Sequence, residues 1–111
     1  MSIPNSADAY IPPEKLAGYL LSETHAVGKS KARLFRELGF NESNVTQLER
    51  ELRNIAQNGD VEETIHSHFG TKYVVDGSIN TPKEKIVRIR TVWIIETGLK
   101  KPRFVTAYPI G

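Results

Sequence analysis

The chain of 111 residues is 39% hydrophobic and 25% charged, with a formal net charge of +2 at neutral pH, which is ordinary for a globular protein of a single domain. It contains no cysteine, so disulfides and thiolate metal sites are excluded. Its start does not resemble a signal peptide, and no run approaches the roughly 18 apolar residues of a membrane helix. We therefore expect a cytoplasmic location, with export as part of a toxin system as the alternative.

The first half of the chain carries the pattern of helices. Residues 1–12 contain Pro4 and Pro12 and predict an extended lead-in. Pro13 suits a first helical position, because its missing N–H is not needed there. Apolar residues at helical spacing then mark a helical part, residues 13–59. Three helices are expected in it: from Pro13 to about Ser22, from Ser30 to a left-handed stop at Gly39, and from Ser43 or Asn44 to Asn58.

After Gly59 the apolar residues alternate, and residues 60–109 predict an antiparallel sheet. Its strand-like segments are "VEETIHSHF", "TKYVVD" closed by Asp76-Gly77, "IVRIRTVWIIE" and "RFVTAY". In the third of these, Trp93 lies on the apolar face that we assign to the core. Helices followed by consecutive strands predict an α+β domain over residues 1–111, with three N-terminal helices packed on a C-terminal antiparallel sheet of about four strands.

The stretch "THAVGKSKARLF" ends a connection and begins a predicted helix. Its Gly28-Lys29-Ser30 resembles the tail of a phosphate-binding loop, but the required glycine five residues earlier is Glu23, whose carboxylate would repel phosphate. The same stretch brings His25 and Lys31 near a helix start, where backbone N–H groups favour anions. From the residues alone, an ordinary helix start with surface lysines is favoured over a catalytic corner.

His66 and His68 stand at alternate positions of a predicted strand, which places both imidazoles on one face. That spacing suits a metal ion, but a site needs a third ligand that the pattern does not supply. We therefore predict no metal site and keep this pair as the alternative metal candidate. One histidine acting without metal, or a solvated strand face, explains the same residues.

Basic residues gather in the predicted sheet, where Arg88 and Arg90 fall on the face opposite Trp93, and Lys72 and Arg103 belong to the same half of the chain. Arginine binds phosphate through two parallel hydrogen bonds. A solubilising face explains the pattern equally well. Two hydroxyl residues of the last strand, predicted to share a face with Phe104, would lie beside the arginines and could bind phosphate oxygens: Thr106 and Tyr108.

The segment "KLAGYLLSETHAVGKSKARLFRELGF" resembles a bacterial family catalogued only as a domain of unknown function. Its members share a Lys-Leu-x-x-Tyr-Leu-Leu, a His-x-x-Gly-x-x-Lys-Ala-x-x-Phe, an Arg-Thr-Val-Trp-Ile and a Pro-Arg-x-x-Thr-Ala-Tyr pattern. These patterns extend here from Lys15 to Tyr108. The domains of this family resemble small standalone bacterial proteins and the C-terminal domains of larger toxin-like proteins. Its architecture resembles the barnase, RelE and colicin group of ribonucleases, which cut RNA without metal. The likeness to these ribonucleases is one of fold alone.

The resemblance and the residues together predict a small metal-independent ribonuclease without a cofactor, which binds RNA and a small cognate antitoxin or immunity protein. His25 would be the acid or base, Lys31 and Arg90 would stabilise phosphate charge, and Thr106 and Tyr108 would position the phosphate. The alternative is a non-enzymatic module that binds a protein or nucleic acid on its open sheet face. Four further residues are predicted to bind substrate: Lys15, Arg88, Arg103 and Lys72.

Overall fold

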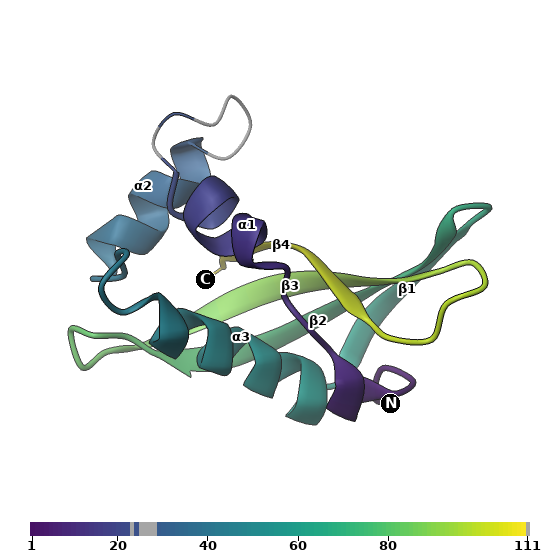
Figure 1. The fold of residues 1–111 in the computed structure, drawn as a ribbon. Helices are drawn as coiled ribbons and strands as arrows, with labels where there is room; N and C mark the ends of the chain where they lie inside the picture. The colour runs from purple at the N-terminus through teal and green to yellow at the C-terminus, as the bar shows by residue number, and fades with distance from the viewer. Residues whose placement is uncertain (23, 25–28, 111) are drawn as a thin grey trace.

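A computed structural model describes residues 1–22, 24 and 29–110 of the chain. It is an α+β structure in which the helical elements precede a four-stranded antiparallel sheet (Figure 1). This confirms the predicted α+β class and the four strands, whereas the helical part is not the predicted set of three helices packed on the sheet. In chain order the elements are η1 (Ser6–Asp8), α1 (Pro13–Lys15), η2 (Leu16–Leu20), α2 (Lys29–Glu37), α3 (Val45–Asn58), β1 (Val61–Ser67), β2 (Gly70–Asn80), β3 (Ile86–Glu96) and β4 (Arg103–Pro109).

The first predicted helix is wrong in its form. Pro13 begins α1 as expected, but α1 is a single turn that continues as the π-helix η2. The Leu21 N–H donates to the Leu16 carbonyl oxygen at 2.8 Å. This wider turn brings Leu16 and Leu21 over one another, and both are buried together with Leu20. Burial of three leucines in the core therefore favours a π-turn, which is a rare element, over a regular helix.

The sheet has the order β1-β2-β3-β4, with every neighbour antiparallel. β2 does not end at Asp76-Gly77 as the sequence predicted. It continues to Asn80, and its register with β3 is unbroken from Gly70 opposite Glu96 to Asn80 opposite Ile86. The pair Asp76-Gly77 therefore lies inside a strand, where each residue has a packing or pairing role rather than a turn role.

A bulge in β4 changes the faces on which its side chains lie. Phe104 is opposite Trp93, but Thr106 is opposite Val92, so Val105 is an extra residue in the ladder. Because successive side chains of a strand alternate, one added residue reverses the faces that follow. Phe104 is buried in the core, whereas Thr106 lies on the other face; the prediction that they share a face is wrong.

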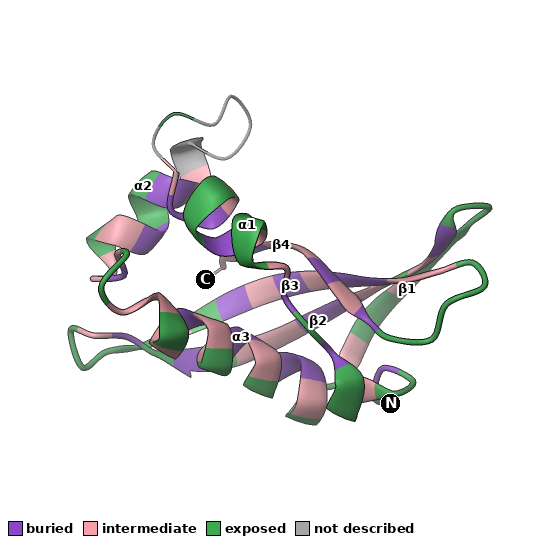
Figure 2. Ribbon diagram, in the orientation of Figure 1, coloured by how far each residue is buried: buried purple, intermediate pink, exposed green. Residues whose placement is uncertain are grey.

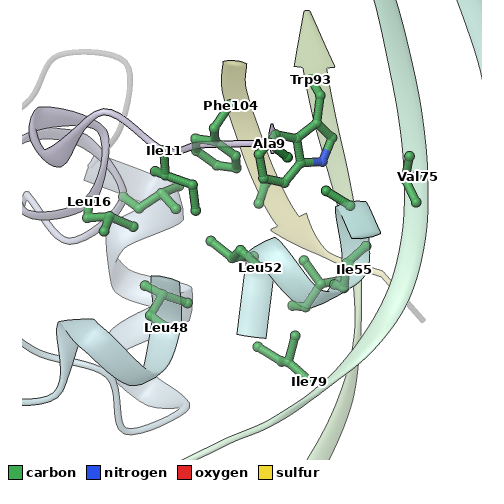
Figure 3. Packing of buried hydrophobic residues seen from close by; sticks show 14 of the residues in the cluster. Ala9, Ile11, Leu16, Leu48, Leu52, Ile55, Val75, Ile79, Trp93 and Phe104 are labelled. Carbon is green, nitrogen blue, oxygen red and sulfur yellow. The ribbon is translucent and has the colours of Figure 1, made fainter. Parts of the chain in front are cut away.

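The core lies between α3 and one face of the sheet (Figure 3). Trp93 and Phe104 pack edge to face with ring centroids 5.3 Å apart. The indole N–H of Trp93 donates to Thr91 Oγ1 at 2.8 Å, and the Thr91 hydroxyl donates to the Val75 carbonyl oxygen at 2.7 Å. These bonds satisfy polar atoms that would be costly to bury alone. The α3 side chains in this core are Leu48, Leu52, Ile55 and Ala56.

The lead-in, residues 1–12, is more than an extended segment. It forms the short helix η1 and contributes Ile3, Ala9 and Ile11 to the core. Tyr10 also pairs in parallel with Arg103 at the start of β4. The turn between β1 and β2 lies away from the helices and is exposed (Figure 2). Among the described helices, none is long and apolar enough to cross a membrane.

Candidate functional site

Polar side chains from three separate parts of the chain meet at the edge strand β4, where η2 and α2 approach it. The Tyr19 hydroxyl lies 3.1 Å from Thr106 Oγ1, and Lys31 Nζ donates to the same Tyr19 hydroxyl at 3.3 Å. Lys15 Nζ lies 4.7 Å from the centroid of the Tyr19 ring and donates to the Val105 carbonyl oxygen at 3.1 Å. We call Lys15, Tyr19, Lys31 and Thr106 the tyrosine cluster.

Local structure explains how the tyrosine cluster forms. Lys15 and Tyr19 are four residues apart around the turn from α1 into η2, a spacing at which helical side chains are neighbours. Lys31 lies in the first turns of α2, which contacts η2. The β4 bulge places Thr106 off the core face and leaves the Val105 carbonyl within reach of Lys15. The site therefore depends on a π-turn and a bulge, two local irregularities that often accompany function.

The charges around Tyr19 change its acidity. Partial burial raises the pKa of the phenol, but hydrogen bonds from Thr106 and Lys31 and the positive charges of Lys31 and Lys15 lower it, and the net direction is downward. A phenol between two ammonium groups ionises more readily, because the phenolate is stabilised by opposite charge. Such a group can accept or deliver a proton closer to neutral pH than an ordinary tyrosine can.

A second group lies on the sheet face opposite the core. Arg90 donates from Nε and Nη2 to the two carboxylate oxygens of Asp76, both at 2.8 Å. The hydrogen bonds from Arg90 outweigh burial and lower the pKa of the Asp76 carboxyl. The same bonds, with a side-chain hydrogen bond to Tyr108, raise the pKa of Arg90. We call Asp76, Arg90 and Tyr108 the arginine group.

The two groups lie two rungs apart on one ladder, with the pair of Thr91 and Ala107 between them. Tyr108 is opposite Arg90, and Thr106 is opposite Val92, two residues further along β3. Diagonal neighbours of this kind have backbones about 7–8 Å apart. The structure therefore brings Lys15, Lys31 and Thr106 together through Tyr19. It places Arg90 and Tyr108 beside them, with Arg90 bound to Asp76.

The other predicted residues have separate surroundings. Lys72 and Arg88 are exposed on β2 and β3. Arg103 Nε donates to Glu96 Oε1 at 3.1 Å, so its charge, like that of Arg90, is partly balanced. The open face is therefore less cationic than its arginine count indicates. His25 lies outside the described residues, and its assignment as acid or base stays a prediction.

The two remaining histidines lie at the far end of the sheet. His66 is on β1 with Nδ1 3.3 Å from Thr71 Oγ1. His68 lies in the turn after β1, with its ring centroid 4.1 Å from that of Phe69. Within the described ranges, no group of three or more His, Cys, Asp or Glu side chains could hold a metal ion. This pair therefore has no third ligand among those residues.

Tyr19 is the site residue that sequence reasoning missed. It was part of the Lys-Leu-x-x-Tyr-Leu-Leu pattern and lies four residues after Lys15, a spacing that predicts contact on a helix. Those two signals could have identified it. Its contact with Thr106, 87 residues away, could not be deduced from spacing.

The fold and the site define a class: a small α+β protein whose antiparallel meander carries a lysine-flanked tyrosine at one edge. Within that class, the chain belongs to the family described as a domain of unknown function, DUF6883, whose sequence profile matches residues 2–111. This confirms the resemblance seen in the motifs. Among curated proteins, none matches the sequence.

A solved structure shares the fold. It is a chain of the contact-dependent growth inhibition toxin–immunity protein complex from Klebsiella pneumoniae 342, with a TM-score of 0.73 and 13% sequence identity. The similarity covers 96% of this chain and 97% of that one. The similarity therefore extends over the whole architecture. At this low sequence identity it shows a shared fold and nothing more.

Proposed function

We propose that this protein is a small metal-independent RNA endonuclease, acting as the toxin of a toxin–immunity pair. The observation that carries the nuclease proposal is the tyrosine cluster: a phenol of lowered pKa in hydrogen-bond contact with Lys31 and Thr106 and close to Lys15. It combines a proton-transfer group with cations that suit a phosphate. Both are needed where a phosphodiester is cleaved without a metal.

In the proposed reaction, the 2′-hydroxyl of RNA attacks the adjacent phosphorus while the bond from phosphorus to the 5′-oxygen breaks. A base takes the proton of the 2′-hydroxyl, and an acid gives a proton to the leaving 5′-oxygen, so that a 2′,3′-cyclic phosphate and a 5′-hydroxyl result. Tyr19 serves as one of these two groups, and His25 is the candidate for the other. Lys15 and Lys31 stabilise the negative charge on the phosphate oxygens.

The toxin part of the proposal is supported by the shared fold with a chain of a toxin–immunity complex. A toxin of this kind requires a partner that blocks it in the producing cell. We therefore propose a small cognate immunity protein as the binding partner. Expression of the chain alone should arrest growth, and co-expression of the neighbouring gene product should restore it. Growth that is unaffected by the chain alone would contradict the toxin proposal.

Cleavage is tested with the purified chain, labelled single-stranded RNA and a chelator. Tyr19→Phe keeps the ring but removes the hydroxyl, and we expect kcat to fall about 100-fold or more, the usual contribution of a proton-transfer group. Tyr73→Phe is the matched control, since Tyr73 is half-buried in β2 beside the core. His25→Ala should reduce cleavage comparably. The nuclease proposal would be refuted if RNA stays intact with the parent protein, or if Tyr19→Phe and the parent cut it at equal rates. Salt-dependent binding of RNA without cleavage would favour the alternative, a non-enzymatic binding module.

The pH profile separates a catalytic Tyr19 from a structural one. Because Lys31 lowers the pKa of Tyr19 by its hydrogen bond and its charge, Lys31→Ala should move the tyrosine ionisation, followed by ultraviolet difference spectroscopy, to higher pH. If the phenolate is the base, the rising limb of kcat against pH should move in the same direction. Lys85 is an exposed loop residue, so Lys85→Ala should leave the tyrosine ionisation and the kcat profile unchanged.

A further inference from the structure

A hollow of about 640 Å³ lies between η1 and the turn that joins β3 to β4. Its walls are held by backbone hydrogen bonds: Tyr10 N–H donates to the Pro102 carbonyl at 3.0 Å, and Phe104 N–H donates to the Tyr10 carbonyl at 3.0 Å. Asn5 Nδ2 donates to the Lys100 carbonyl at 3.1 Å. The hollow is thus formed by the fold itself. It is lined by Asp8, Tyr10, Gly98, Leu99, Lys100 and Lys101.

The lining combines the groups that single-stranded nucleic acid requires. Tyr10 and Leu99 are 41% and 59% exposed, although both are large and apolar. Lys100 and Lys101 are exposed next to them. An aromatic ring offers a stacking surface to a base, and lysines beside it hold the backbone. Asp8 would repel a phosphate seated inside the hollow, but its carboxylate can accept a hydrogen bond from the amino group of a base.

The hollow and the tyrosine cluster lie along the same strand edge. Tyr10 pairs with Arg103, three residues before Thr106 on β4. At about 3.3 Å per residue, this separation is roughly 10 Å along the strand. Neighbouring nucleotides of an extended RNA strand can bridge such a distance. The β4 edge therefore connects a candidate cleavage site to a hollow that suits a base.

We propose that this hollow is a nucleobase subsite for single-stranded RNA, which holds a nucleotide beyond the two that the scissile phosphate joins. The base stacks on Tyr10, and Lys100 and Lys101 contact the backbone phosphates. The inference rests on the proposed nuclease function and specifies its substrate: an unpaired strand of several nucleotides rather than a dinucleotide or a duplex.

The test compares cleavage of a single-stranded oligoribonucleotide with cleavage of a dinucleotide that contains only the scissile phosphate. Tyr10→Ala should lower kcat/KM for the oligonucleotide about tenfold, which corresponds to a stacking contribution of about 1.4 kcal/mol. It should leave the dinucleotide rate unchanged. Tyr10→Phe keeps the stacking ring and should behave like the parent. The double variant Lys100→Ala/Lys101→Ala should weaken the oligonucleotide reaction and its salt dependence, whereas Lys83→Ala/Lys85→Ala, in the exposed loop before β3, should not.

Binding measurements keep this inference separate from the nuclease proposal. If the parent binds the oligonucleotide without cutting it, and Tyr10→Ala weakens that binding while Tyr10→Phe does not, the subsite stands and the nuclease fails. If Tyr10→Ala equals the parent with the oligonucleotide, the subsite is overturned whatever the rate of cleavage. If Tyr10→Ala loses affinity for the immunity protein and not for RNA, the hollow binds a protein partner and the subsite proposal is overturned too. A parent protein that neither binds nor cuts RNA would overturn both the subsite and the nuclease proposals.

Discussion

At the scale of single residues, the Asp76–Arg90 pair shows how an ion pair can change the meaning of a predicted site. The Asp76 side chain is 7% exposed and that of Arg90 is 39% exposed. The sequence predicted Arg90 as a free cation for phosphate, but two of its N–H groups already bind a carboxylate. The pair therefore acts first as a link between β2 and β3. A role for Arg90 in phosphate binding stays a prediction.

Replacement of Asp76 by asparagine should lower the melting temperature at neutral pH, and the effect should depend on pH. Hydrogen bonds from Arg90 lower the pKa of Asp76 in the folded protein, whereas the unfolded value is about 3.9. The stabilisation is therefore complete above the unfolded pKa and is lost as pH falls through the folded pKa. Thermal unfolding of parent and Asp76→Asn should differ most at neutral pH and converge in acid.

A matched control for this prediction is Asp60→Asn. Asp60 pairs with the N-terminal ammonium group at 3.3 Å, but its side chain is 85% exposed. Exposed ion pairs contribute little to stability because water screens them. The control should therefore melt close to the parent at every pH. A constant difference between Asp76→Asn and the parent from neutral pH into acid would contradict the proposed ion-pair contribution.

At the scale of elements, Gly77 determines how closely α3 packs on β2. A Cβ atom added at Gly77 would lie 2.8 Å from Ile55 Cγ1 and 3.1 Å from Ile55 Cγ2. The sequence predicts a turn at Asp76-Gly77, because that dipeptide usually marks one. In the structure the missing side chain makes room for a helix instead. Local composition alone does not separate these two uses of glycine.

Gly77→Ala should reduce the free energy of unfolding by about 1–3 kcal/mol, the usual cost of an overpacked contact. Ile55→Ala should cost about 2–5 kcal/mol through the cavity that it leaves. Because the added methyl group would occupy part of that cavity, the double variant should cost less than the two single changes combined. Urea unfolding of the four proteins measures this coupling. Strictly additive losses would show that Gly77 and Ile55 do not limit one another.

Gly18→Ala is the control for the glycine change itself. The nearest atom to a Cβ at Gly18 would be Glu14 Cβ at 3.8 Å, an ordinary contact. Gly18 lies in η2 and is exposed. Alanine there should be neutral or stabilise the protein by up to about 1 kcal/mol, since glycine is a poor helical residue.

At the scale of the whole molecule, residues 1–12 connect the two edge strands of the sheet, β1 and β4, to the helical part. The Val61 N–H, at the start of β1, donates to the Met1 carbonyl at 2.7 Å, and Tyr10 pairs with Arg103 at the start of β4. Between these points Ile3 is 2% exposed within the core. Residues 1–12 are thus part of the packed structure, and they also form one wall of the hollow proposed as a base subsite.

Ile3→Ala should therefore destabilise the protein by about 2–5 kcal/mol, as a truncation in a regular helix or strand of the core would. Ile86→Ala is the matched control, because Ile86 is 75% exposed at the start of β3, and it should change the free energy of unfolding little. Chemical denaturation of both variants measures the difference. Similar stabilities for the two would mean that the lead-in contributes little to the fold.

The order of the elements and the class of fold follow from local patterns in the sequence. The apolar period changes after Gly59, and this signal is local, because each helix or strand presents its own apolar face to the core. The same locality made the family recognisable, since its motifs are short runs such as the one from Lys15 to Leu21. Lys31 and Thr106 could be named as candidates in this way, but nothing in the spacing joined them.

Which of the candidate residues meet depends on contacts between distant segments of the fold. Tyr19 reaches Thr106 because η2 is a π-turn, because β4 carries a bulge and because β4 is an edge strand beside the helical part. Each of these is a property of packing between distant segments rather than of residue spacing. The same packing balanced Arg90 with Asp76. The sequence therefore shows which residue types are present, and the fold shows that Tyr19, between two lysines, is the group to test.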